Sequence, residues 1–142
     1  MKLRTFVAVA VCALPIAFAC DRPENRAETR EDVSEARREG AEEVREARRD
    51  AAEQGAEAQR DVREELRQGG EVGDATRQAA EETAQAQYDV KIQQLEAEHR
   101  VAMQQCESLT GEAQETCKRD ADGRLEAGRQ HARTMLEGQR GE

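Results

Sequence analysis

The segment Cys106-Glu-Ser-Leu-Thr-Gly-Glu-Ala-Gln-Glu-Thr-Cys117 holds two cysteines that are eleven positions apart. On one straight helix that separation is about 16 Å, whereas the two Cα atoms of a disulfide lie within about 7 Å. The cysteines can therefore pair only if the chain folds back between them, and Thr110, Gly111 and Glu112 lie at the midpoint. Because glycine favours turns, we predict a helical hairpin that turns at these three residues and is closed by a Cys106–Cys117 disulfide.

Apolar residues on both sides of this turn follow helical spacing. The seam before the turn alternates steps of four and three, as in packed helices, and consists of Tyr88, Ile92, Leu95, His99, Ala102, Cys106 and Leu109. The stripe after it consists of Ala113, Cys117, Ala121, Leu125, Gly128, Ala132 and Met135. Folding at the turn matches the two, with Ala102 opposite Ala121, Leu95 near Gly128 and Tyr88 near Met135. We predict that the hairpin covers 74–137 and that 138–142 form a disordered tail.

An eleven-residue repeat precedes the hairpin. Residues 33–43 read VSEARREGAEE, residues 44–54 read VREARRDAAEQ, and two weaker copies follow. Small apolar residues recur at the first, fourth and eighth places, and the stripe is Val33, Ala36, Gly40, Val44, Ala47, Ala51, Gly55, Ala58, Val62 and Leu66. Eleven residues make three turns at 3.67 per turn, so the stripe runs nearly straight along a helix. We predict a long helix over 29–68 and a hinge over 69–73, where three of five residues are glycine.

The role of this long helix has two readings. Burying such small residues stabilises little, so one reading is an exposed spacer that carries the hairpin away from a membrane. The other is a binding face for a partner helix or a membrane. Direct membrane binding is the weaker option, because the stripe lacks large apolar residues and the polar face is not basic. Charged pairs three residues apart support an isolated helix, and they are Glu35/Arg38, Glu42/Arg45, Glu46/Arg49 and Glu57/Arg60.

The first nineteen residues have the layout of a bacterial export signal. Lys2 and Arg4 precede an apolar run over 6–19, which is shorter than the roughly 20 residues of a membrane span. Ala19-Cys20 resembles the end of a lipobox, and acylation of Cys20 leaves the other two mature cysteines as an even pair. We predict a signal peptide over 1–19, a lipid on Cys20, a tether over 20–28 and a location at the periplasmic face of the envelope. Plain secretion with an unmodified Cys20 is the alternative.

Composition argues against a globular, catalytic or nucleic-acid-binding protein. The chain is 37% charged, has no tryptophan and carries a net charge of −9. So few bulky residues do not form an ordinary core, and an acidic surface repels nucleic acid. His99, Cys106, Cys117 and His131 are candidate zinc ligands, but the cysteines lack C-x-x-C spacing and export favours their disulfide. We predict an all-α, non-globular, partly disordered protein with no metal, no cofactor and no enzyme activity.

Two resemblances add to this reading. Through Leu109, Gly111 and Ala113, the segment between the cysteines is similar to the C-x-x-L-x-G-x-A-x-x-x-C signature of small exported helical proteins of proteobacteria. Those proteins have no known activity, so the resemblance implies export and a clipped hairpin only. The eleven-residue repeats resemble those of late-embryogenesis-abundant stress proteins, although those are usually rich in lysine rather than arginine. That likeness implies helices that form mainly on drying or against membranes.

Together these features predict a cell-envelope lipoprotein that acts as a non-catalytic structural or protein-interaction module. It meets the membrane through its N-terminal lipid, and its helices bind a protein partner or a second copy. The alternative is a desiccation or osmotic protectant whose amphipathic repeats fold conditionally.

Overall fold

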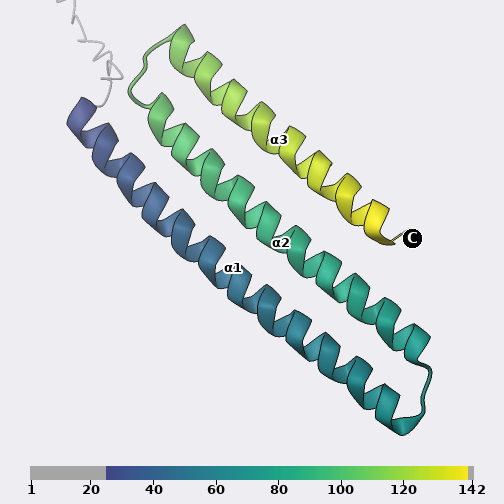
Figure 1. Ribbon diagram of the computed structural model, residues 1–142. Helices are drawn as coiled ribbons and strands as arrows, with labels where there is room; N and C mark the ends of the chain where they lie inside the picture. Colours follow the sequence, from purple (N-terminus) through teal and green to yellow (C-terminus); the bar gives the residue numbers. More distant parts are fainter. Residues whose placement is uncertain (1–24, 141–142) are drawn as a thin grey trace, which may run out of the picture.

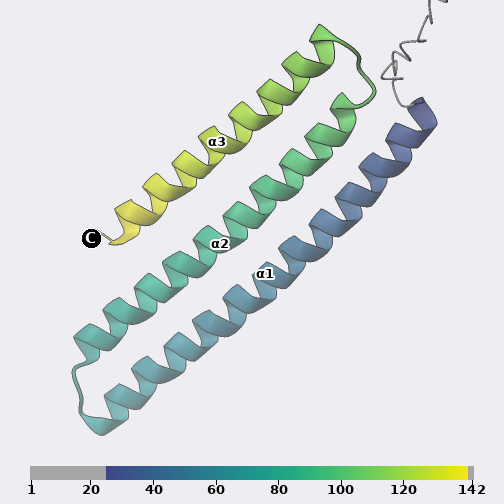
Figure 2. The same cartoon turned by 180° about the vertical axis from the view of Figure 1, so that it is seen from behind.

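The computed structural model describes residues 25–140, which form the helices α1 (Arg26–Gln68), α2 (Val72–Cys106) and α3 (Glu112–Arg140). The helices lie side by side and antiparallel, with α2 in the middle (Figures 1 and 2). Within the described residues, α1 and α3 each contact α2 but not one another. The predicted all-helical architecture is confirmed, and the molecule is one layer of three helices.

Helix α1 begins earlier than expected because of a cap that the sequence analysis overlooked. The Asn25 side chain accepts hydrogen bonds from the backbone N–H groups of Ala27 and Glu28, both at 3.0 Å. Its own amide donates to Glu28 Oε2 at 3.2 Å. These contacts satisfy N–H groups that a helix start otherwise leaves unpaired. The boundary of the predicted tether at residue 28 is therefore wrong, since Arg26, Ala27 and Glu28 are helical.

The glycine-rich segment is a tight turn that is shorter than the predicted hinge. Gly69 takes a left-handed conformation with φ of 72°, and the Gly70 N–H donates to the Glu65 carbonyl oxygen at 3.0 Å. This is the usual glycine ending of a helix. Helix α2 then starts at Val72, so Gly73 lies inside it. The turn reverses the chain and brings α2 back along α1 (Figure 1).

The small-residue stripe of α1 is the face that packs on α2. Ala36, Gly40 and Ala58 are buried, and most other members of the stripe are half-buried, whereas Leu66 is exposed. A Cβ atom placed on Gly40 would lie 2.6 Å from the Cβ of Ala97. The two backbones therefore approach closely, which only small residues permit.

The long helix is consequently not a spacer that stands apart from the hairpin. Most of its surface is exposed, as expected, but α2 covers its stripe from Val33 to Val62. The partner is a second stripe on α2, in which Ala75, Ala86 and Ala97 are eleven residues apart, as are Ala79, Val90 and Val101. Helix α2 thus uses one face for α1 and the opposite face for α3.

The hairpin of α2 and α3 has the predicted register. Leu95 lies against Gly128, where an added Cβ would come within 2.6 Å of a Leu95 methyl carbon. Arg129 Nη2 donates to Glu96 Oε1 at 2.7 Å across the same pair of helices. Tyr88 and Met135 line one groove between α2 and α3, as the register predicted, but Leu136 is the buried residue there and Met135 is 54% exposed.

The hairpin is also longer than the expected range of 74–137. The predicted disordered tail over 138–142 is wrong for residues 138–140, which continue α3. Arg140 Nη2 reaches Gln85 Oε1 of α2 at 2.7 Å, and this contact holds the last turn in place. Within residues 25–140, none of the helices is long and apolar enough to cross a membrane.

Candidate functional site

The disulfide predicted between Cys106 and Cys117 is present. The two Cα atoms are 5.7 Å apart, inside the range that disulfides require. Cys106 is fully buried, whereas Cys117 is half-buried. The bond joins the last residue of α2 to the second turn of α3, so it closes the hairpin at one end.

The residues expected at the turn occupy it as follows. Gly111 has φ of 60°, a conformation that glycine adopts without strain. Thr110 precedes it, and Glu112 is the first residue of α3. The Glu107 carboxylate receives Lys118 Nζ at 2.8 Å and Gln114 Nε2 at 2.9 Å, and these bonds brace the turn from the α3 side.

Cys20, the predicted lipid site, lies outside the described residues, as do the predicted signal peptide and most of the tether. Asn25 is the first described residue, five positions after Cys20. The acylation therefore stays a prediction.

The two histidines do not meet the cysteines. His99 Nε2 lies 2.8 Å from Asp122 Oδ1, two residues from the Arg124 that the hairpin register placed opposite it. His131 lines a groove with Tyr88 and Met135 at the far end of the hairpin. Within residues 25–140, no group of three or more His, Cys, Asp or Glu side chains is placed to hold a metal ion.

The ion pairs expected along α1 do not form. In residues 25–140, Glu35/Arg38, Glu42/Arg45, Glu46/Arg49 and Glu57/Arg60 are all without the bridge that their spacing suggested. Arg45 instead donates from Nε to the Ala41 carbonyl oxygen at 3.0 Å. Of the α1 residues, Glu43 alone has an ion pair within the described chain, and its partner is Arg100 of α2.

One side of the α1–α2 pair gathers the arginines. Two grooves between these helices run along it, and α1 contributes only basic and uncharged residues to them. We call this side the arginine face and define it by Arg26, Arg30, Arg37, Arg45 and Arg48. From α2 and the turn after it come Gln94, Glu98, Val101, Gln105, Ser108 and Leu109 among others. Leu109 is 38% exposed at the end nearest the disulfide.

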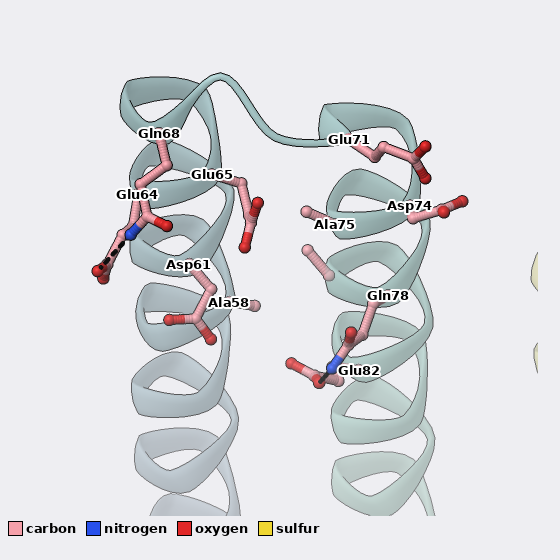
Figure 3. Close-up of a pocket in the computed structure, with 11 residues that line it drawn as sticks. Ala58, Asp61, Glu64, Glu65, Gln68, Glu71, Asp74, Ala75, Gln78 and Glu82 are labelled. Carbon is pink, nitrogen blue, oxygen red and sulfur yellow. Dashed lines mark hydrogen bonds between the residues drawn. The ribbon is translucent and has the colours of Figure 1, made fainter.

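The other side of the pair is acidic near the glycine turn. Figure 3 shows Ala58 and Ala75 pointing into the gap between α1 and α2, Ala75 nearer the turn, with carboxylates around them. We call this cleft the acidic face and define it by Asp61, Glu64, Glu65, Glu71, Asp74 and Glu82. Gln68 and Gln78 each donate to one of these carboxylates, Glu64 and Glu82, at 3.0 Å.

The two faces point in opposite directions because of helix geometry. Each residue turns about 100° around the axis. Arg37 follows the buried Ala36 by one step, whereas Asp61 follows the buried Ala58 by three steps, which is about 60° in the opposite sense. The eleven-residue repeat keeps the two sets apart, because Arg26, Arg37 and Arg48 share one place in it while Glu39, Asp50 and Asp61 share another.

The apolar stripe was predicted from the sequence, whereas this separation of charge was not. Its signal lies in the same repeat, since basic and acidic residues recur at different places of the eleven. The charged residues were read only as pairs three positions apart, which does not show on which side of the helix each sign collects.

In its described residues the protein is therefore a single antiparallel layer of three helices, in which one disulfide joins α2 to α3. Comparison of the chain with protein-family models, with curated proteins and with solved structures gives no match. The two resemblances noted from the sequence accordingly remain expectations.

Proposed function

We propose that this chain is an exported, lipid-anchored module of the bacterial cell envelope, and that it works without catalysis by presenting its helical surfaces to a partner. The Cys106–Cys117 disulfide carries the proposal, because such bonds persist in oxidising compartments outside the cytoplasm. It agrees with an apolar leader that ends at Cys20. An acyl chain there provides membrane attachment, which becomes stable when two or more chains are present.

The surface of the described helices suits the binding of a large partner rather than catalysis on a small molecule. Small-molecule sites are usually enclosed and largely apolar. The grooves of this molecule are shallow, lie between neighbouring helices and are rimmed by charged side chains. A protein, a second copy of the chain or a membrane surface fits such a shape, whereas nucleic acid is disfavoured by the net negative charge.

The protectant function is the second candidate, and one observation weighs against it. Conditional folding requires a stripe that lacks a partner until water is removed. Ala36 and Ala58 are 8% and 2% exposed because α2 covers them, so the repeats are already packed within the chain. Circular dichroism of the mature protein in dilute buffer separates the two functions. We expect strong helicity without added alcohol, and a disordered spectrum would favour the protectant.

The intact mass of the protein recovered from bacterial membranes tests both the lipid on Cys20 and the Cys106–Cys117 disulfide. The expected mass corresponds to a chain that begins at Cys20, carries a diacylglycerol addition and lacks two hydrogens at Cys106 and Cys117. A chain that begins at Cys20 without added lipid would remove the anchor from the proposal. A chain with two free thiols at the other cysteines would remove the export argument.

A further inference from the structure

We propose that the arginine face docks on an anionic phospholipid surface, so that the protein lies along the membrane rather than standing away from it. This inference rests on the proposed function for its location, but the surface itself is defined by the fold. The arginine face gathers five cations on one side of a chain whose net charge is −9. The net charge alone predicts that an anionic membrane repels the protein. The arginine face predicts attraction instead, because the fold gathers these cations on one side.

The arginines of this face are available for an external anion. Within the described residues, none of the five forms an ion pair. In contrast, Arg100 and Arg129 are held by Glu43 and Glu96 on neighbouring helices. Guanidinium groups bind phosphate oxygens through paired hydrogen bonds, which makes phosphate the group that these side chains recognise best.

The negative charge of the molecule does not cancel this attraction. The acidic face lies on the opposite side of the helix pair, and a helix with side chains is about 10 Å across. Among the residues that line the two grooves of the arginine face, Glu98 is the one carboxylate, and it accepts a hydrogen bond from Gln94 Nε2 at 3.0 Å. The Debye length is about 8 Å at physiological salt, so charges on the far side are largely screened from a surface on the near side. The cations, in contact with the surface, feel the field of the headgroups at full strength.

The position of the face also fits attachment near the membrane. Arg26 is six residues after Cys20, and six extended residues span at most about 20 Å. An acyl chain on Cys20 therefore keeps Arg26 and Arg30 within reach of the headgroups. At the same end, Leu109 offers a partly exposed apolar side chain to the interface.

A second copy of the chain is the competing occupant, since its acidic face carries the complementary charge. We favour lipid because exposed ion pairs between proteins are individually weak and lose side-chain freedom. The apolar side chains that line the two faces are small, mostly alanine and valine, so their burial would stabilise a dimer little. A membrane, in contrast, presents many mobile phosphate headgroups, which can bind all the arginines of the arginine face at the same time.

The test uses the Cys20→Ser protein after removal of residues 1–19, with its disulfide intact, so that no acyl chain contributes. The protein is sedimented with vesicles of pure phosphatidylcholine and with vesicles that contain 30% phosphatidylglycerol. The test variant is Arg30→Gln/Arg37→Gln/Arg48→Gln. The matched control is Arg38→Gln/Arg49→Gln/Arg60→Gln, which removes the same charge from the same helix at places that point away from α2.

We expect binding to the anionic vesicles only, and its loss when sodium chloride is raised from 50 to 500 mM. The test variant should bind about 100-fold more weakly, because each of its three arginines contributes about a fivefold gain in affinity near an anionic surface. The control should lose less than about threefold. Circular dichroism of both variants establishes that the helices are intact.

Four results would overturn the inference: equal loss in the two triple variants, equal binding to neutral vesicles, no binding, or assembly of the protein without vesicles that the test variant abolishes. The last result would assign the arginine face to a second copy. None of them bears on the lipid at Cys20, which the intact mass tests separately.

Discussion

Gly40 and Gly55 both lie in the packed stripe of α1, yet their surroundings differ. A Cβ on Gly40 would lie 2.6 Å from Ala97 Cβ and 3.4 Å from its Cα, whereas a Cβ on Gly55 has nothing within 4 Å. Alanine is favoured over glycine in a helix by about 1 kcal/mol. At Gly40 this gain is outweighed by overpacking, which destabilises by about 1–3 kcal/mol.

We therefore expect Gly40→Ala to lower the melting temperature and Gly55→Ala to raise it. For a chain of this size, 1 kcal/mol corresponds to about 4 °C. The pair is its own control, since the same substitution is made twice in one helix. A Gly40→Ala protein that melts higher than the parent would mean that α1 and α2 do not approach at Ala97.

Asn25 is a second residue with a definite role. Asn25→Ala removes the side chain that accepts from Ala27 and Glu28, and we expect a loss of about 1 kcal/mol. Amide hydrogen exchange in the first turn of α1 should become faster. Asn25→Asp keeps the acceptor and should retain protection, so similar exchange in both variants would argue against the cap.

At the scale of the elements, the disulfide matters most for α3. That helix contacts only α2 within the described residues, and its buried members are Ala121, Ala132 and Leu136. A bridge that closes a loop of this size contributes about 3 kcal/mol. We expect reduction to increase amide exchange across Glu112–Arg140, whereas the α1-facing side of α2 stays protected.

The control for reduction is the Cys106→Ala/Cys117→Ala protein. It should show the fast exchange of α3 from the start and should not respond to reductant. Uniform loss of protection in all three helices on reduction would instead show that the layer folds as one cooperative unit.

At the scale of the whole molecule, the packing of α1 on α2 determines the length. Helix α1 has 43 residues, which at 1.5 Å each is about 65 Å. Because α2 and α3 lie alongside it, small-angle scattering of the mature, unlipidated protein should give a maximum dimension of about 70 Å. An α1 that swung out from the glycine turn, in line with α2, would extend the molecule to about 115 Å.

Much of this architecture was readable from local patterns. The eleven-residue period identified the α1 face that becomes buried, and the heptad seam with the two cysteines predicted the register of Leu95 against Gly128. These features are readable because they depend on residues within a few turns of one another. The helix ends were predicted less accurately, because Asn25 and Arg140 act through local side-chain contacts that do not recur in any repeat.

The sequence by itself determined the helical state, the buried face of α1, the face of α2 that packs on α3 and the pairing of Cys106 with Cys117, because each follows from spacing along the chain. Only the tertiary structure decided that α2 is the partner of the α1 stripe, and that five arginines and six carboxylates collect on opposite sides of that pair. The physical reason is that a stripe of small residues can pack against any helix that approaches closely, so it does not specify its partner. The partner is α2 because the chain reverses direction at Gly69 and because residues as distant in the chain as Gly40 and Ala97 come into contact.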